Sequence, residues 1–299
     1  MLLGLSLDYR FDSRRESPSV CLVSKSFAWS TIYNRLAFAA NLFQNYRKEN
    51  NMKNEKLMPF AAAFGWFGAY ILLSLFAASL PDAVDCAVTI IALWGLVFIC
   101  AGRFEDKKDF IARLSHGGVR ATAPIKLLIA FIAGTGLNLA FGGLLPLLPL
   151  PESIVESYTS ASSVYEEPTN ALMFKTVFLV PILEETVFRG LIGDRLTRSL
   201  PRWLALPFAA LVFALMHGNI LWISYAFLSG LILMSIYCRF DSILPCVSFH
   251  LAFNASNYLW EKLLNLPDNA KGYAISFAVG AVIASGALVL LFMKNKNKK

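Results

Sequence analysis

The sequence predicts an all-α fold, a polytopic bundle of about eight transmembrane helices with both termini on the cytoplasmic side. Hydrophobic residues make up 57% of the chain and charged residues only 16%, whereas a soluble domain has roughly 45–50% and about 25%. Apolar runs of about 20 residues, enough to span a bilayer, recur along the chain. Lysine and arginine gather in alternate segments between those runs. These observations exclude a secreted enzyme, a disordered scaffold and a cytosolic nucleotide-binding fold.

Residues 1–56 precede the first apolar run and are expected to form a cytoplasmic N-terminal extension. Residues 27–43 within it are too short for a span and fit an interfacial helix. Met52 and the lysine-rich stretch after it form an ordinary start for an inner-membrane protein. Two alternatives therefore stay open: residues 1–51 are translated, or they come from an over-extended gene model.

The spans follow from the apolar runs. The stretch at 203–238 is interrupted by a polar His-Gly-Asn tripeptide, so we expect two short spans there, 203–217 and 220–238. The whole transmembrane bundle is expected at 57–293. Its other six spans are predicted at 57–80, 83–102, 125–148, 171–192, 243–260 and 273–293.

The positive-inside rule supports this count and the topology. Alternation from a cytoplasmic N-terminus puts 103–124, 193–202, 239–242 and the basic tail 294–299 inside, and these segments hold most of the cations of the connecting segments. The longest outside segment, 149–170, is acidic. Topology therefore accounts for the net charge of +7 without a nucleic-acid partner.

Three polar clusters lie inside apolar spans. A charge near the middle of a bilayer costs at least about 2.5–3.5 kcal/mol, so such residues are functional candidates. The clusters are Glu184, Glu185 and Arg189 in one span, His217 with Phe213 in the next, and His250 with Asn254 in a third.

Helical spacing predicts how these side chains are arranged. Glu185 and Arg189 are four residues apart, so they share a face and are expected to form an ion pair. Glu184 is rotated by about 100° from Glu185 and is expected to face a partner helix. Phe213 lies one turn before His217 and is expected to pack against its ring.

Two prolines bear on the same spans. Pro181 has no N–H, so it is expected to free a backbone carbonyl and to kink its helix three residues before Glu184. A helix start at Pro207, a favoured first-turn position, would reduce the depth of His217 so that it matches the other two polar clusters more closely.

These groups together suit hydrolysis. A buried glutamate can take a proton from water at neutral pH, and a histidine beside it can hold that water. A second histidine and an amide can donate to the oxyanion of a tetrahedral intermediate. A structural interpretation stands beside this one, in which Glu185 and Arg189 only join helices and His217 is a hydrogen-bonded core histidine.

The clusters resemble the three motifs of the CPBP family of intramembrane endopeptidases, which process CAAX proteins and bacteriocins and are also called the ABI or type II CAAX prenyl endopeptidase family. EExxxR matches Glu184–Arg189, FxxxH matches Phe213–His217 and HxxxN matches His250–Asn254, within roughly residues 168–262. The resemblance implies that Glu184 is the general base, His217 its partner, and His250 with Asn254 the oxyanion site. It also implies supporting roles for Glu185, Arg189 and Phe213.

The metal requirement is a separate question, because the family has also been described as metalloproteases. The sequence has no HExxH zinc motif, and its five cysteines contain no CxxC pair. Asn254 would be a poor zinc ligand. We therefore expect a metal-free glutamic mechanism without a cofactor, with a zinc enzyme as the alternative.

The resulting functional hypothesis is an intramembrane endopeptidase in the cell membrane, inner or plasma, that cleaves a peptide or membrane-protein substrate near the cytoplasmic face. Bacterial members of the resembled family are associated with peptide maturation, bacteriocin self-immunity and regulation of membrane sensors. The alternative is a non-catalytic protein that binds a sensor kinase or a bacteriocin receptor through its helices. A transporter is disfavoured, because the sequence has no inverted repeat.

Overall fold

The computed structural model describes residues 57–77, 124–163, 168–264 and 266–293, with a few residues between 80 and 95, namely 80–81, 84–85, 87–88, 90–91 and 95. Four predicted features lie outside the described residues. They are the N-terminal extension with its interfacial helix, most of the span at 83–102, the inside segment after it and the basic tail.

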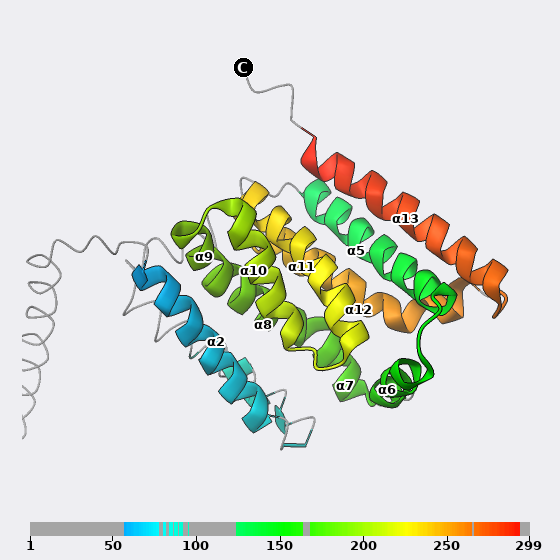
Figure 1. The fold of residues 1–299 in the computed structure, drawn as a ribbon, viewed down its shortest axis with the longest axis horizontal. Helices are drawn as coiled ribbons and strands as arrows, with labels where there is room; N and C mark the ends of the chain where they lie inside the picture. Colours follow the sequence, from blue (N-terminus) through cyan, green and yellow to red (C-terminus); the bar gives the residue numbers. More distant parts are fainter. Residues whose placement is uncertain are drawn as a thin grey trace, which may run out of the picture. The chain divides into compact units, whose positions relative to one another are not determined.

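The regular structure of the described residues is helical throughout (Figure 1). In chain order the elements are α2 (Leu57–Ala77), α5 (Pro124–Leu144), the 3-10 turn η1 (Leu145–Leu147), α6 (Glu152–Ser162), α7 (Asn170–Phe174), the π-helical η3 (Lys175–Leu179), α8 (Val180–Glu184), the π-helical η4 (Glu185–Gly193), α9 (Asp194–Ser199), α10 (Arg202–Leu215), α11 (Ile220–Phe240), α12 (Leu244–Leu264) and α13 (Ala270–Phe292).

Three described segments are long and apolar enough to cross a membrane: Pro124–Leu147, which is α5 with η1, and the helices α11 and α13. The apolar stretches of α2 and α10 are shorter. Large hydrophobic side chains are exposed on several helices, among them Leu72, Val282 and Trp203 at 70%, 70% and 77%. Apolar surface of this kind indicates a membrane protein. The total of eight spans and the orientation of the termini stay predictions.

The predicted division of the apolar stretch at 203–238 is confirmed. α10 ends at Leu215 and α11 begins at Ile220. Gly218 turns the chain between them with φ of 72°, a left-handed value that favours glycine. Asn219 then caps α11, because its side-chain Oδ1 accepts a hydrogen bond from the N–H of Leu221.

The predicted span start at residue 203 agrees with the structure, but the alternative helix start at Pro207 does not. The helix begins at Arg202 and continues through Pro207. Its first turn is already formed by Leu204 and Ala205, whose N–H groups both donate to the carbonyl of Pro201. The loss of one backbone donor at Pro207 therefore does not stop the helix.

The predicted span at 171–192 differs in its winding from a regular α-helix. Two π-helical segments, η3 and η4, flank the short α8 that ends at Glu184. In η3 the N–H of Val180 donates to the carbonyl of Lys175, five residues earlier. π segments inside α-helices are rare and are frequent at functional sites.

The same helix also runs past its predicted end at residue 192 and stops at Ser199. Charged residues extend it because they are partnered within the protein. Arg198 donates from Nη2 to Asp194 Oδ2 at 2.5 Å, and Arg195 donates from Nη1 to the carbonyl of Leu191 at 2.9 Å.

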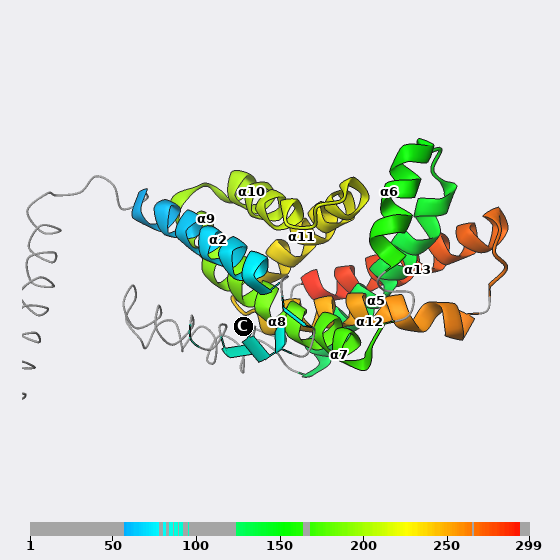
Figure 2. The same cartoon turned by 90° about the horizontal axis from the view of Figure 1, so that it is seen from below.

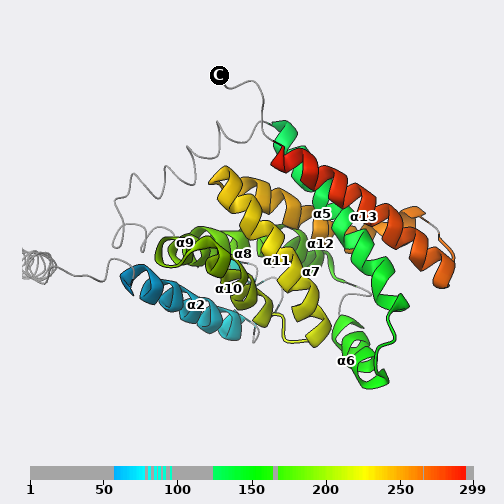
Figure 3. The same cartoon turned by 45° about the horizontal axis from the view of Figure 1, so that its top comes forward.

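The long helices pack against each other in separate groups, which are visible in Figures 1 and 3. α5, α12 and α13 lie side by side, while α2 packs on η4 and α9, and α10 packs on α11. The acidic segment after α5 contains α6, which was not predicted. α6 stands beside the first turn of α11 (Figure 2), where Tyr158 packs edge-to-face on Trp222.

Candidate active site

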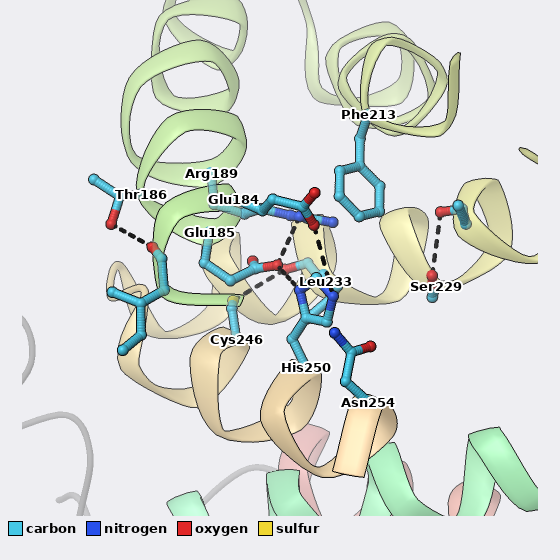
Figure 4. A network of polar contacts seen from close by, with 12 residues as sticks. Glu184, Glu185, Thr186, Arg189, Phe213, Ser229, Leu233, Cys246, His250 and Asn254 are labelled. Carbon is cyan, nitrogen blue, oxygen red and sulfur yellow. Dashed lines mark hydrogen bonds and ion pairs between the residues drawn. The ribbon is translucent and has the colours of Figure 1, made fainter. Parts of the chain in front are cut away.

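The three polar clusters predicted from the sequence form one group where η4, α12 and the end of α10 approach each other (Figure 4). Glu184 ends α8 and Glu185 begins η4, while His250 lies on α12. These three residues are at most 8% exposed. Buried charges require partners, so each contact below identifies what holds a charge in place.

Glu185 is fully buried and joins two helices. Its Oε1 accepts hydrogen bonds from Arg189 Nη1 at 2.8 Å and from His250 Nδ1 at 2.8 Å (Figure 4). Arg189 is 1% exposed, and its guanidinium carbon lies 4.2 Å from the centre of the Phe213 ring. The predicted pair of Glu185 and Arg189 is therefore present, and a cation–π contact covers the arginine.

Glu184 faces other helices, as predicted. Its Oε1 accepts a hydrogen bond from the hydroxyl of Tyr70 on α2 at 3.1 Å, and its Oε2 lies 3.7 Å from His250 Nε2. The carboxylate thus has a donor on one oxygen and a histidine ring near the other. Sequence reasoning missed Tyr70, because it lies in a span without a polar motif and only the packing of α2 brings it to Glu184.

His250 lies between the two glutamates. A carboxylate oxygen only accepts, so Nδ1 of His250 must carry the hydrogen in its bond to Glu185. The bond from Nδ1 to Glu185 fixes the ring, and in this orientation Nε2 points toward Glu184. The orientation of His250 is therefore set by Glu185.

His217 is tied to its own helix. Its Nδ1 lies 3.2 Å from the carbonyl oxygen of Phe213, which accepts, so Nδ1 carries the hydrogen and Nε2 is the nitrogen that can accept. Its ring packs edge-to-face on Phe213 at 4.9 Å, as predicted. No hydrogen bond joins His217 to Glu184 among the residues described, although the two interact electrostatically.

Phe213 is the aromatic centre of the group. Its ring makes edge-to-face contacts with Phe188 at 5.2 Å, with His217 at 4.9 Å and with His250 at 6.1 Å. It is 2% exposed. The phenylalanine of FxxxH thus packs on both histidine rings and on Arg189, in addition to the hydrogen bonds that orient them.

Asn254 uses the carbonyl that Pro181 frees. In η3 the N–H of Val180 donates to Lys175, and Pro181 has no N–H, so neither residue satisfies the carbonyl of Thr176. Asn254 Nδ2 donates to that oxygen at 2.9 Å. The predicted freed carbonyl therefore fixes the amide of Asn254 from the opposite helix.

The described side chains of the site bear on whether it could hold a metal ion. A catalytic zinc site in a protein usually has three side-chain ligands. Within the part of the chain that the structure describes, no group of three or more His, Cys, Asp or Glu side chains has a geometry that could hold a metal ion. The fit of the described residues to zinc is therefore poor.

Comparison with known proteins supports the resemblance found in the motifs. Residues 167–256 match the family model described as Type II CAAX prenyl endopeptidase Rce1-like. This Rce1-like domain contains all three motifs but not α2 with Tyr70. No curated protein and no solved structure matches the chain. The match supports a CAAX-type intramembrane protease that acts on a protein or peptide.

Proposed function

We propose that this chain is a multi-pass endopeptidase of the cell membrane that hydrolyses a peptide bond near the cytoplasmic face with water activated by Glu184. The observation that supports this most is the buried carboxylate of Glu184, with Tyr70 on one oxygen and His250 3.7 Å from the other. It lies within the Rce1-like domain. A buried carboxylate with one oxygen left for a proton suits a general base.

The first step is proton transfer from water to Glu184 Oε2. The hydroxide attacks the substrate carbonyl carbon, and the electron pair of the C=O bond moves to oxygen to give the tetrahedral oxyanion. His217 is suited to orient the water, because its Nδ1–H is engaged with Phe213 and its Nε2 can accept. The electron pair on the oxyanion then re-forms the C=O bond, the C–N bond breaks with its electron pair on nitrogen, and Glu184 returns the proton to that nitrogen to leave a carboxylic acid and an amine.

The oxyanion is assigned to His250 and Asn254. Asn254 has two N–H donors, of which one is bound to Thr176 and the other is left for substrate. His250 donates from Nε2 only when both ring nitrogens carry hydrogen, and the Glu185 carboxylate on Nδ1 balances that positive charge. Glu185, Arg189 and Phe213 are supporting residues that orient the histidine.

The proposal is tested with Glu184→Gln, which keeps the size of the side chain and removes the base. Membranes from cells that express the wild type or the variant at equal abundance are compared by mass spectrometry of new peptide termini. We expect at least one peptide released only by the wild type, with its rate reduced by at least about 10²-fold in the variant. Glu156→Gln on the exposed α6 is the matched control and should cleave normally.

Two other outcomes would replace the proposal. A cellular phenotype that persists in Glu184→Gln at normal abundance would favour the non-catalytic interaction protein, because binding does not need a proton acceptor at that position. Complete loss of cleavage with a chelator, restored by zinc, would overturn the metal-free mechanism but would not contradict the protease function. Farnesylated and unmodified forms of one CAAX peptide would then show whether the substrate must be lipidated.

A further inference from the structure

We infer that Tyr70 is a positioning residue for Glu184, supplied by a helix outside the Rce1-like domain. Its hydroxyl holds Oε1 of the carboxylate, so that Oε2 is the oxygen that takes the proton from water. The inference rests on the proposed function of Glu184 as a base. It adds a residue that neither the three motifs nor the matched stretch 167–256 contains.

The contact has a defined direction. The Tyr70 hydroxyl lies 3.1 Å from Glu184 Oε1, and a carboxylate accepts, so the tyrosine donates. Tyr70 is 8% exposed and Glu184 is 8% exposed, so water competes little for the bond. A hydrogen bond to a charged group is among the stronger ones in a protein, so this bond selects one orientation of the carboxylate.

Packing fixes the position of the hydroxyl. The Tyr70 ring meets Phe188 edge-to-face at 5.0 Å, and Phe188 is 1% exposed. On the same face of α2, Ala63 and Trp66 are buried, and Trp66 lies 5.9 Å from the guanidinium carbon of Arg195. Because α2 packs on η4 and α9 along this face, the helix delivers the hydroxyl to Glu184 as part of a rigid surface.

The two oxygens of Glu184 therefore have different surroundings. Oε1 is occupied by Tyr70, while Oε2 faces His250 Nε2 at 3.7 Å, too far for a direct hydrogen bond. Rotation of the carboxylate would exchange the two oxygens and break the bond to Tyr70. The tyrosine thus acts on the base through its geometry and does not itself touch the reacting atoms.

The test is Tyr70→Phe, which keeps the ring and its contact with Phe188 and removes only the hydroxyl. The substrate is a synthetic quenched fluorescent peptide with the sequence released by the wild type and not by Glu184→Gln, assayed with protein in proteoliposomes. We expect kcat to fall about 10- to 100-fold, with KM changed less than about twofold because substrate binding is untouched. Tyr237→Phe on α11, also a buried tyrosine, is the matched control and should keep both constants.

A second measurement separates positioning from stability. On the Glu184→Gln background, Tyr70→Phe should change the residual rate less than about twofold, because the two residues act through one contact. Thermal unfolding of all variants is followed, and rates are expressed per folded protein. A merely structural tyrosine would lower stability and leave kcat per folded protein unchanged.

The outcomes are distinguishable. Full activity of Tyr70→Phe together with an inactive Glu184→Gln overturns this inference and leaves the proposed function intact. Full activity of Glu184→Gln, or the absence of any peptide specific to the wild type, overturns the proposed function. A Tyr70→Phe variant in which KM rises and kcat stays unchanged would show that Tyr70 contacts the substrate. That result also contradicts the positioning role.

Discussion

Two interfaces in this molecule bury helices against each other by different means. Where α5 meets α12 and α13, glycines bring backbones together: a Cβ on Gly134 would lie 2.0 Å from the carbonyl oxygen of Phe249, and a Cβ on Gly280 would lie 2.3 Å from the N of Ala140. Where η4 meets α12 and α2, the contacts are made by Glu184 and its charged neighbours. We name these the small-residue interface and the polar cluster.

The two interfaces differ in what their residues contribute. The small-residue interface holds helices together, and the polar cluster holds the groups proposed for catalysis. The hydrophobic effect does not favour association of helices inside a bilayer, because lipid tails are as apolar as the side chains. Close van der Waals packing of small residues can hold such helices together instead. Buried charges are an expensive means, and they are retained mainly where function needs them. α12 takes part in both, since Phe249 touches Gly134 and the next residue, His250, bonds Glu185.

Arg189→Met tests the polar cluster and should have the largest effect on stability. It leaves Glu185 fully buried with His250 as its remaining partner among the residues described. Removal of one member of a buried pair costs roughly 3–5 kcal/mol, and the double variant Glu185→Gln, Arg189→Met should recover part of it. The measurement is the free energy of unfolding in detergent titrations.

The matched control is Arg198→Met, in a pair of the same spacing. Arg198 bonds Asp194, but its side chain is 37% exposed, so the change should cost at most about 1 kcal/mol. Equal losses in Arg189→Met and Arg198→Met would contradict the claim that burial makes the polar cluster different.

Gly134→Ala tests the small-residue interface and should have the second largest effect. The new Cβ meets backbone that cannot rotate away, so we expect a loss near the upper end of the roughly 1–3 kcal/mol of overpacking. Gly142→Ala on the same helix has no atom within 4 Å of its Cβ, and the better helix propensity of alanine should stabilise it by about 0.5–1 kcal/mol. Thermal unfolding of the two variants, with cellular abundance, gives the comparison.

A stable and fully active Gly134→Ala would break the distinction between the interfaces. It would mean that α5 and α12 need not approach as closely as they do. Activity per folded molecule is also expected to fall in Gly134→Ala, because a shift of Phe249 moves the neighbouring His250. Gly142→Ala should leave activity unchanged.

The sequence was sufficient for those parts of the site that depend on spacing within one helix. The pair of Glu185 and Arg189, the contact of Phe213 with His217 and the division at Gly218 follow from short-range geometry and turn chemistry, and all three are present. The motifs also predicted the family model that residues 167–256 match. Periodicity and motif spacing are local properties, and these features are local.

Several contacts between helices were not predictable from the sequence. Tyr70 reaches Glu184 only through the packing of α2, and nothing in its own span marks it. The π winding of η3 and η4 was not predicted from the sequence, and in η3 it leaves the carbonyl of Thr176 to Asn254. The alternative helix start at Pro207 is not observed, because the turn before it, at Leu204 and Ala205, is already helical.

The pair of Asn138 and Asn257 places a polar contact at the small-residue interface. Its removal tests the comparison of the two interfaces and should have the smallest effect on stability. Asn138 Nδ2 donates to Asn257 Oδ1 at 2.6 Å between α5 and α12, but neither residue is charged. Hydrogen bonds between membrane helices average about 0.6 kcal/mol and reach about 1.7 kcal/mol. A double-mutant cycle with Asn138→Ala and Asn257→Ala should give a coupling free energy in that range. A coupling as large as that of Glu185 with Arg189 would show that polarity, and not charge burial, sets the polar cluster apart, because an uncharged pair would then hold two helices as strongly.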